Sequence, residues 1–535
     1  MERLRGAGAA KSPGVVGFSR GYARGLWFLF SRALARRAPV VWTALGAAVA
    51  FYGFAPRIRA ALLLALALAG LSVTYRLSSG SASRRLGGIG FALSLGLAWG
   101  AAAALAETAR AQPGELAAFP VHRVAGVVVV DSRRTASNNT IMTIRLEEAE
   151  ISSPGWRATL SWPRGRPLVL LVTDSAGEFP AGLRLEIEGP ALIDSTQALW
   201  WASAGKLRPG SFVSWIPCFR HRVKQAVSER IAAVSGKAFP LAQALLLGVK
   251  DDIDGEESRL FREAGCAHIL ALSGQHLSIL CSLMTLLFAK LLKRGRVADM
   301  ASLAIALVFT WLAGAGPSLL RAALMSLAGL LLRKLDRPQQ GITVLALVFC
   351  LALGWKPADA RGLSFTLSYA AMAGLLIFSS RWECLLWRLP PFLAKALAAS
   401  FSALCATAPV SLGAFGSFAL GGILAATLSG PLVLLFMWSL LGSCLAGTFL
   451  PFLDSAFAWW HGFLHGALLA VMRLGSLFPL VRPGGDAMKA LASAAIVALS
   501  LFVYACPYGE APLDAILRRR RSANRPSQER HDSRL

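Results

Sequence analysis

The sequence predicts a polytopic α-helical membrane protein of about 10–12 spans with a small extracytoplasmic β domain. The 535-residue chain is 55% hydrophobic and only 16% charged, whereas soluble domains are about a quarter charged. Long apolar segments recur from Pro39 to Tyr504, and the mean hydropathy is +0.55. Between residues 107 and 215, short runs such as VAGVVVV and TIMTIRL replace them, which is typical of strands too short to span a membrane.

Lys and Arg set the topology and divide the chain into regions. The residues before the first apolar segment are too many and too basic for a cleavable signal peptide, and basic loops favour the cytoplasmic side. We therefore expect a cytoplasmic tail over 1–38, transmembrane helices over 39–106, an external β domain over 107–215, amphipathic or interfacial helices over 216–267, a transmembrane domain over 268–506 and a basic cytoplasmic tail over 507–535.

The second membrane region contains a series of expected spans. They lie near 268–289, 297–315, 317–333, 341–355, 362–379, 392–412, 419–447, 455–479 and 486–505. Glycines and a proline between 421 and 431 could break one of these into re-entrant pieces, so the span count between 413 and 485 stays open.

The net charge of +26 has several explanations. Part of it sets topology, and the remainder could attract anionic lipid, nucleic acid or an acidic substrate. The cysteines form no CxxC pair or metal spacing. Cys218 and Cys266 flank a segment predicted to lie outside, so whether they form a disulfide stays open.

The segment HILALSGQHLSIL, residues 268–280, is polar in the middle of an apolar run. On an unbroken helix, Ser273 and His276 would share a face, and His268 and Gln275 would be nearly aligned. Ser-Gly is also a common place for a kink. The polar residues therefore form interhelical hydrogen bonds, or they line a translocation path or a catalytic pocket.

Arg321 is a second polar residue in an apolar segment, GPSLLRAALMSL. Pro317 begins the expected helix, and Ser318 lies three residues before the arginine on the same face. A buried arginine needs a partner, water or an anionic group. Alternatively, its side chain extends to the membrane interface, because it lies only about one turn inside the helix.

Metal and hydrolase signals are weak. His461 and His465 have the spacing of HExxH without its glutamate, and neighbouring aromatic residues favour a membrane interface. The acidic residues from 251 to 257 suit a helix N-terminus, with Asp254 as N-cap and Glu257 completing a capping box, better than a cation site. Gly265 is expected to end that helix. There is no Walker A or nuclease motif, so the sequence predicts no cofactor, no metal site and no catalytic residue.

Taken together, several of these stretches resemble the ComEC-type competence proteins, the DNA-internalisation channels of transformable bacteria. The resemblance is carried by ALLLGVKDDIDGEESRLFREAGCAHILALSGQHLSIL, GPSLLRAALMSL, LSFTLSYAAMAGLLIF and ATAPVSLGAFGSFALGGILAATLSGPLVLL. It covers about 240–450 well and the N-terminal half more loosely. It implies an external OB-like domain and a transmembrane channel domain over 268–506.

The sequence departs from this family in three places. Gln275 stands where an apolar residue is usual, and 364–368 lacks the family's Gly and Gln. The metallo-β-lactamase-like domain of many members is missing from the sequence, so we identify the form without it.

The resemblance implies a channel for single-stranded DNA in the bacterial inner membrane. The partners it implies are single-stranded DNA, membrane lipid, a DNA-receptor protein, a cytoplasmic helicase-like motor and further copies of the chain. The candidate residues of the translocation path or gate are His268, Ser273, Gly274, Gln275, His276, Pro317, Ser318 and Arg321. Other functions stay open: a membrane-embedded enzyme that uses Ser273 and His276 on a lipid or envelope substrate, a non-DNA transporter of the same fold, and a scaffold that docks competence partners.

Overall fold

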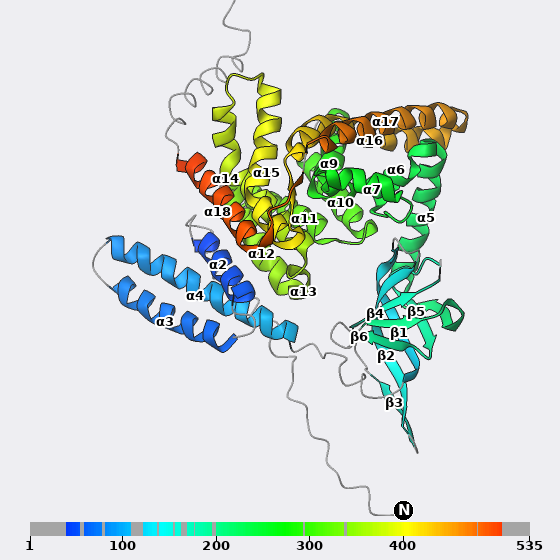
Figure 1. The fold of residues 1–535 in the computed structure, drawn as a ribbon, viewed down its shortest axis with the longest axis horizontal. Helices are drawn as coiled ribbons and strands as arrows, with labels where there is room; N and C mark the ends of the chain where they lie inside the picture. Colours follow the sequence, from blue (N-terminus) through cyan, green and yellow to red (C-terminus); the bar gives the residue numbers. More distant parts are fainter. Residues whose placement is uncertain are drawn as a thin grey trace, which may run out of the picture. The chain divides into compact units, whose positions relative to one another are not determined.

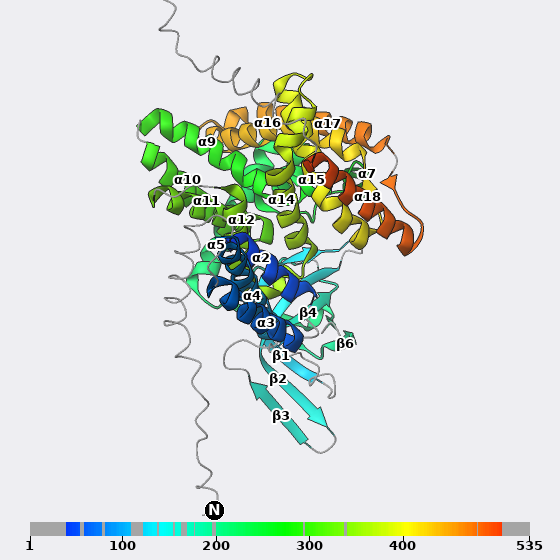
Figure 2. The ribbon, with the colours of Figure 1, turned by 90° about the vertical axis from the view of Figure 1, so that its left-hand side faces the viewer.

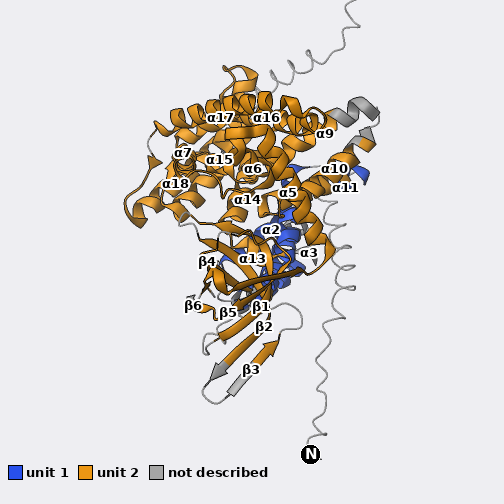
Figure 3. Ribbon diagram, turned by 90° about the vertical axis from the view of Figure 1, so that its right-hand side faces the viewer, with its two compact units in different colours: residues 1–105, 331–355 blue, residues 106–330, 356–535 orange. Residues whose placement is uncertain are grey.

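The computed structural model describes residues 39–53, 58–77, 81–108, 121–135, 139–153, 156–161, 168–175, 177–194, 199–292, 295–335, 340–478 and 480–505. The chain divides into two compact units (Figure 3), residues 1–105 with 331–355 and residues 106–330 with 356–535. Both predicted basic tails, 1–38 and 507–535, lie outside the described residues.

The first unit consists of apolar helices. They are α2 (Pro39–Ala48), which continues as a π-helical turn over Val49–Gly53, α3 (Ile58–Leu77), α4 (Ser81–Thr108) and α12 (Gly341–Trp355). Gly96 lets α2 and α4 pack with their backbones in contact, because a Cβ there would meet the carbonyl of Thr43. The indole Nε1 of Trp99 donates a hydrogen bond of 3.0 Å to the carbonyl oxygen of Cys350 and joins α4 to α12. Small residues and buried hydrogen bonds of this kind hold membrane helices together.

The second unit begins with the predicted β domain, an eight-stranded sheet. Its strands are β1 (Val121–Arg134), β2 (Thr140–Ser153), β3 (Trp156–Ser161), β4 (Leu168–Thr173), β5 (Leu183–Glu188), β6 (Ala191–Asp194), β7 (Leu199–Ala202) and β8 (Leu207–Phe212). The hydrogen-bonded order is β6-β7-β4-β2-β1-β5-β8, with β3 paired to β2, and only the β4–β7 pair is parallel among the described strands. Figure 2 shows β2 and β3 as a hairpin at one end of this domain.

Alternation along the strands builds the core of the sheet. On β5 the apolar Leu183, Leu185 and Ile187 are buried, and the charged residues between them are not. The sheet therefore has one face against a core and one polar face, as period-two patterning requires.

The helices of the second unit follow the sheet (Figure 1). They are α5 (Trp215–Ser235), α6 (Phe239–Leu247), α7 (Gly255–Glu263), α8 (Ala267–Leu270), α9 (Gly274–Leu292), α10 (Gly295–Leu312), α11 (Pro317–Lys334), α13 (Pro357–Ala360), α14 (Leu363–Leu385), α15 (Pro391–Phe415), α16 (Gly421–Phe449), α17 (Asp454–Ser476) and α18 (Gly485–Ala505). Short 3-10 turns lie at Ala204–Lys206, Gly236–Ala238 and Pro451–Leu453. The two-residue strands β9 (Phe418–Ala419) and β10 (Leu480–Val481) pair antiparallel.

Five helices of the described residues are long and apolar enough to cross a membrane: Gly87–Ala106, Leu363–Leu385, Pro391–Phe415, Gly421–Phe449 and Gly485–Val503. Shorter apolar helices lie at Val40–Gly53, Leu64–Thr74, Asp299–Leu312 and Gly341–Trp355. The chain is thus a mostly helical membrane protein with a small sheet, and the larger count of about 10–12 spans stays a prediction. The possible re-entrant break, which the sequence left open, does not occur, since α16 continues through Pro431.

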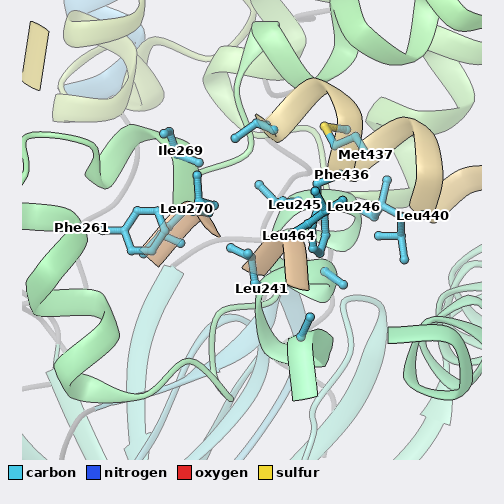
Figure 4. Packing of buried hydrophobic residues seen from close by; sticks show 14 of the residues in the cluster. Leu241, Leu245, Leu246, Phe261, Ile269, Leu270, Phe436, Met437, Leu440 and Leu464 are labelled. Atoms are coloured by element: carbon cyan, nitrogen blue, oxygen red, sulfur yellow. The ribbon is translucent and has the colours of Figure 1, made fainter. Parts of the chain in front are cut away.

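The main helical core combines short and long helices. Leu245 of α6, Phe261 of α7, Leu270 of α8, Met437 of α16 and Leu464 of α17 belong to one buried cluster (Figure 4). The short polar helices that precede the membrane region are therefore packed into it rather than lying free on its surface.

A buried ion cluster joins the sheet to the helices. Asp131 of β1 accepts two hydrogen bonds from Arg220 (3.0 and 2.9 Å), one from Lys224 (2.8 Å) and one from the amide of Ala181 (2.9 Å). Burial would by itself raise the pKa of Asp131. The hydrogen bond from Arg220 and the charges of Lys224 and Arg220 outweigh burial, so this pKa lies well below its usual range.

The same arginine also caps a membrane-region helix. Arg220 donates its Nε to the carbonyl of Trp311 (2.9 Å) and its Nη2 to that of Leu312 (3.1 Å), at the C-terminal end of α10. A cation there complements the negative end of the helix dipole. The β domain is thereby fixed to the end of α10 through a single side chain of α5.

Candidate functional site

The SGQH segment is a helix start, not the middle of a helix. The chain leaves α8 after Leu270, and α9 begins at Gly274. The amide of Gln275 donates to Ser273 Oγ (3.2 Å), and the amide of Ser273 donates to His276 Nδ1 (2.9 Å). These reciprocal bonds form a capping box in which histidine takes the place of the usual glutamate.

The helix break corrects the expected polar stripe. Because the helix is interrupted, His268 and Gln275 do not align on one face, and both are exposed. His276 is 2% exposed and is held by Ser273, whose Oγ lies 3.1 Å from the histidine Nδ1. The Nδ1 atom that accepts the backbone amide is unprotonated, so a neutral His276 carries its proton on Nε2. The Ser273–His276 contact is thus explained by capping.

Arg321 lies against this helix start. A Cβ added to Gly274 would be 2.8 Å from Arg321 Nη2, so the absence of a side chain there makes room for the guanidinium. Arg321 Nη1 donates a short hydrogen bond to the carbonyl oxygen of Ser368 on α14. The arginine is directed toward α9 and α14, so interhelical contact, not extension to the interface, describes its side chain.

Within the described part of the chain, the charge of Arg321 has no carboxylate partner. No carboxylate of the described residues forms an ion pair with it. Its Nε is buried and makes no hydrogen bond within the described part of the chain. The N-terminus of α9, which carries a partial positive charge, is its neighbour. The local potential therefore favours an anion.

The structure places five of the eight candidate residues close together in space. Ser273, Gly274 and His276 form the helix start, Arg321 lies beside it, and Gln275 is on its exposed side. The other three lie near these in the chain but have different positions: Pro317 is the first residue of α11, Ser318 is half-buried one turn before the arginine, and His268 is on α8.

Sequence reasoning missed the contribution of Ser368. Its segment, LSFTLSYAAMAGLLIF, is one of those that carry the family resemblance, but the contact uses a main-chain carbonyl. Every residue type presents a carbonyl, so its identity gives no signal. Three segments that are far apart in the chain thus meet at one guanidinium.

The two histidines of α17 have separate structural partners. His461 is fully buried, with Nδ1 2.9 Å from the carbonyl of Val234 and Nε2 3.3 Å from Ser439 Oγ. His465 Nε2 lies 3.0 Å from a carboxylate oxygen of Glu257, and both side chains are largely buried. Among the described residues, no group of three or more His, Cys, Asp or Glu side chains could hold a metal ion.

The expected capping box at Asp254 is wrong, because its side-chain hydrogen bonds do not form. Asp254 is the N-cap of α7, but its carboxylate makes no capping hydrogen bond, and Glu257 contacts His465 instead. The predicted stop at Gly265 is confirmed by its φ of 72° and by the hydrogen bond from the amide of Cys266 to the carbonyl of Phe261.

The question of a disulfide is also settled. Cys218 and Cys266 are both free thiols, the first half-buried in α5 and the second buried beside Ser429. The chain therefore does not use this crosslink to hold the segment between them.

Comparison with known proteins identifies the region that contains this site. Residues 245–508 match the sequence model of the family described as "Competence protein". These residues are a domain of the competence protein family. The competence domain thus contains α9, α11 and α14, the three helices that meet at Arg321.

Curated relatives share part of the competence domain. "ComE operon protein 3" of Bacillus subtilis (strain 168) is 29% identical over 223 residues, which cover 41% of this chain and 27% of the relative. "Uncharacterized protein YcaI" of Escherichia coli (strain K12) is 26% identical over 201 residues, 35% of this chain and 26% of the relative. The chain thus spans about a quarter of the length of these relatives. No solved structure is significantly similar to it.

Proposed function

We propose that the protein is an inner-membrane channel that passes single-stranded DNA into the cytoplasm during natural transformation, and that Arg321 contacts the passing phosphates. The observation that carries this proposal is an arginine beside the N-terminus of α9 that has no carboxylate partner among the described residues. Membership of the competence family supports a role in DNA uptake.

The chemistry of the site suits a phosphodiester. A phosphate oxygen accepts hydrogen bonds from a guanidinium, and it is attracted to the partial positive charge of a helix N-terminus. At the start of α9 the cap already uses the amides of Ser273 and Gln275, so Arg321 is the main donor in this proposal. The unbonded Nε of Arg321 has no competing partner among the described residues. The helix cap at Ser273 and His276 holds the start of α9 in place, so these two residues are positioning residues in this proposal.

The β domain would receive the strand. We propose that it is OB-like and lies on the extracytoplasmic side. Its antiparallel β1–β2–β4 meander and its parallel β4–β7 pair are compatible with a Greek-key barrel. No Walker A motif occurs in the chain, so a cytoplasmic helicase-like motor would supply the energy, and a DNA-receptor protein would deliver the strand. Further copies of the chain are also proposed partners.

The test is DNA internalisation in a transformable bacterium that lacks its own competence channel. Arg321→Gln is expected to lower the uptake of labelled DNA into the nuclease-protected pool by roughly 10-fold or more, because a charge-assisted hydrogen bond contributes about 1.5–3 kcal/mol. Surface binding and membrane abundance should not change. Arg333→Gln removes the same charge from the exposed end of the same helix and is the matched control. Normal uptake by the Arg321 variant would show that this arginine is only structural.

Deletion of the gene tests the proposal as a whole. Loss of internalisation with surface binding retained is the expected result. Normal internalisation would exclude the DNA channel and leave a non-DNA transporter. The enzyme alternative is not favoured, since His276 uses the same Nδ1 for Ser273 Oγ and for the backbone amide of the cap.

A further inference from the structure

We propose that the start of α5 and the end of α10 form a lipid anchor, which inserts into the headgroup boundary of the bilayer on the side where the β domain lies. The anchor comprises five apolar residues: Val213, Trp215, Ile216, Phe219 and Trp311. The inference does not depend on DNA being the cargo.

These side chains are exposed although they are large and apolar. The exposed fractions are 50% for Val213, 75% for Trp215, 47% for Ile216, 53% for Phe219 and 36% for Trp311. The three aromatic rings form one continuous surface. The ring centroid of Phe219 lies 6.5 Å from that of Trp215 and 6.4 Å from that of Trp311, on which Phe219 stacks. A contiguous aromatic patch of this kind marks an interaction surface.

The patch continues the exposed apolar side of α10, which supports lipid as its occupant. Val297, Met300, Leu307 and Val308 are exposed along one side of that helix, at helical spacing, and this side ends at Trp311. Ala306 and Phe309 are buried on the opposite side. An apolar stripe that follows an entire apolar helix is covered by hydrocarbon. The aromatic residues at its end correspond to the belt at a membrane–water interface.

The charges next to the anchor fit the headgroup layer. Within three turns of α5 after Trp215, the chain places Arg220, Arg222 and Lys224, and Asp131 pairs with the first and the third. Arg222 is exposed, and a cation at this depth is attracted to lipid phosphate. The partner is therefore a surface with an apolar interior and an anionic rim, which is the chemistry of a phospholipid leaflet.

The anchor is fixed to the β domain. Val213 donates its amide to the carbonyl of Gly182 at 2.9 Å, and a Cβ at Gly182 would meet the ring of Pro217. Gly182 has a φ of 86°, so the close approach needs glycine. Because of these contacts, the depth of the anchor in the leaflet sets the height of the sheet above the bilayer.

Fluorescence quenching of the full-length protein in vesicles tests the anchor. The chain has 15 tryptophans, so the signal of one is taken as the difference between the wild type and Trp215→Phe, with vesicles of zwitterionic and anionic phospholipid. The expected result is that lipid brominated near the glycerol end of the acyl chain quenches the Trp215 signal at least twofold, whereas iodide in the water quenches it weakly.

Trp201→Phe is the matched control, because Trp201 is a half-buried residue of the β domain. Its signal should respond to iodide and not to brominated lipid. If the Trp215 signal behaves like that of Trp201, the patch faces water and its partner is a protein, and the lipid anchor is excluded.

Should Trp215→Phe fail to fold, photocrosslinking of the wild-type chain with a lipid labelled near its headgroup gives the same decision. Labels on peptides containing residues 213–219 support the anchor, and their absence overturns it.

Discussion

Replacing Asp131 by asparagine is expected to weaken the joint between the β domain and the helices by about 3 kcal/mol. The carboxylate neutralises Arg220 and Lys224, whose side chains are only 10% and 19% exposed. Removing one partner of a buried pair costs about 3–5 kcal/mol. We take the lower end, because Asp131 itself is 23% exposed and an amide oxygen still accepts a hydrogen bond.

Hydrogen exchange of the full-length protein in lipid nanodiscs measures this effect. The amide of Ala181, which donates to Asp131, and the amides of the α10–α11 loop report on the joint. A loss of about 3 kcal/mol predicts that local opening becomes more frequent by roughly 150-fold. Amides in the centre of the sheet should keep their protection, since the change is confined to the joint.

Glu188→Gln is the control that tests the reasoning. Glu188 pairs with Arg208 at 2.9 Å, the same distance as the Asp131–Arg220 contact, but these side chains are 49% and 70% exposed. An exposed pair contributes about 0–1 kcal/mol, so this variant should exchange like the wild type. Equal effects of the two substitutions would refute the claim that burial gives the Asp131 cluster its strength.

The low pKa of Asp131 also predicts a pH dependence. Because the folded pKa is depressed, the unfolded chain binds more protons, and stability rises with pH. The contribution of Asp131 is fully present above a pH of about 4 and is lost as the pH falls below it. The exchange protection of Ala181 should therefore decrease in acid for the wild type and much less for Asp131→Asn. The same acid dependence in both would assign it to other groups.

Two further substitutions test the site and its support. Gly274→Ala places a Cβ 2.8 Å from Nη2 at the end of the Arg321 side chain. We expect a stability loss below about 1 kcal/mol, because that end can shift, together with a fall in DNA internalisation. Unchanged uptake at normal protein abundance would contradict this. Glu257→Ala removes the partner of the largely buried His465 and should lower the unfolding free energy by about 1–3 kcal/mol in denaturant titrations. Glu263, on the same helix, has a side chain that is 44% exposed, so Glu263→Ala should stay within about 0.5 kcal/mol. Equal losses would argue against a specific role for the contact.

The sequence predicted the broad fold because its signals are long-range averages. Apolar segments and alternating strands are repeated over many residues, so the membrane helices and the β sheet follow from composition and period. The glycine stop at 265 follows from a single residue, because only glycine accepts a positive φ without strain. The number of spans does not follow, since an apolar helix of 10–17 residues, such as Asp299–Leu312, also suits a buried position.

Capping shows where sequence patterns fail. Asp254 and Glu257 have the spacing of a capping box, yet Glu257 contacts a histidine 208 residues away. Ser273 and His276 form the reciprocal cap although histidine is not the usual residue. A local motif offers a hydrogen-bond partner, and tertiary packing decides which donor or acceptor takes it. The Ser-Gly pair did indicate an interruption, but periodicity alone favoured a continuous helix.

The candidate site combines features that the sequence contains separately. Gly274 is small, Arg321 is charged, and Ser368 offers only its carbonyl. Nothing in the spacing of these residues predicts that they meet, because contacts across some 50 to 100 positions depend on how the helices pack. The resemblance of each segment to one family was the only link between them.

A site with a single arginine favours passage of the DNA strand over its retention. Arg321 and the N-terminus of α9 are both positive, so water or a transient anion is needed to offset their repulsion. A site that binds phosphate tightly needs several convergent donors, whereas the structure shows one arginine, Arg321, against Gly274 at the start of α9. Conduction requires binding that is strong enough for entry and weak enough for release. In a phosphodiester chain, each departing phosphate is followed by the next. We therefore expect that adding a second arginine beside Gly274, for example by Gln275→Arg, increases DNA retention and slows uptake. Faster uptake would mean that attraction, and not release, limits the passage of the strand.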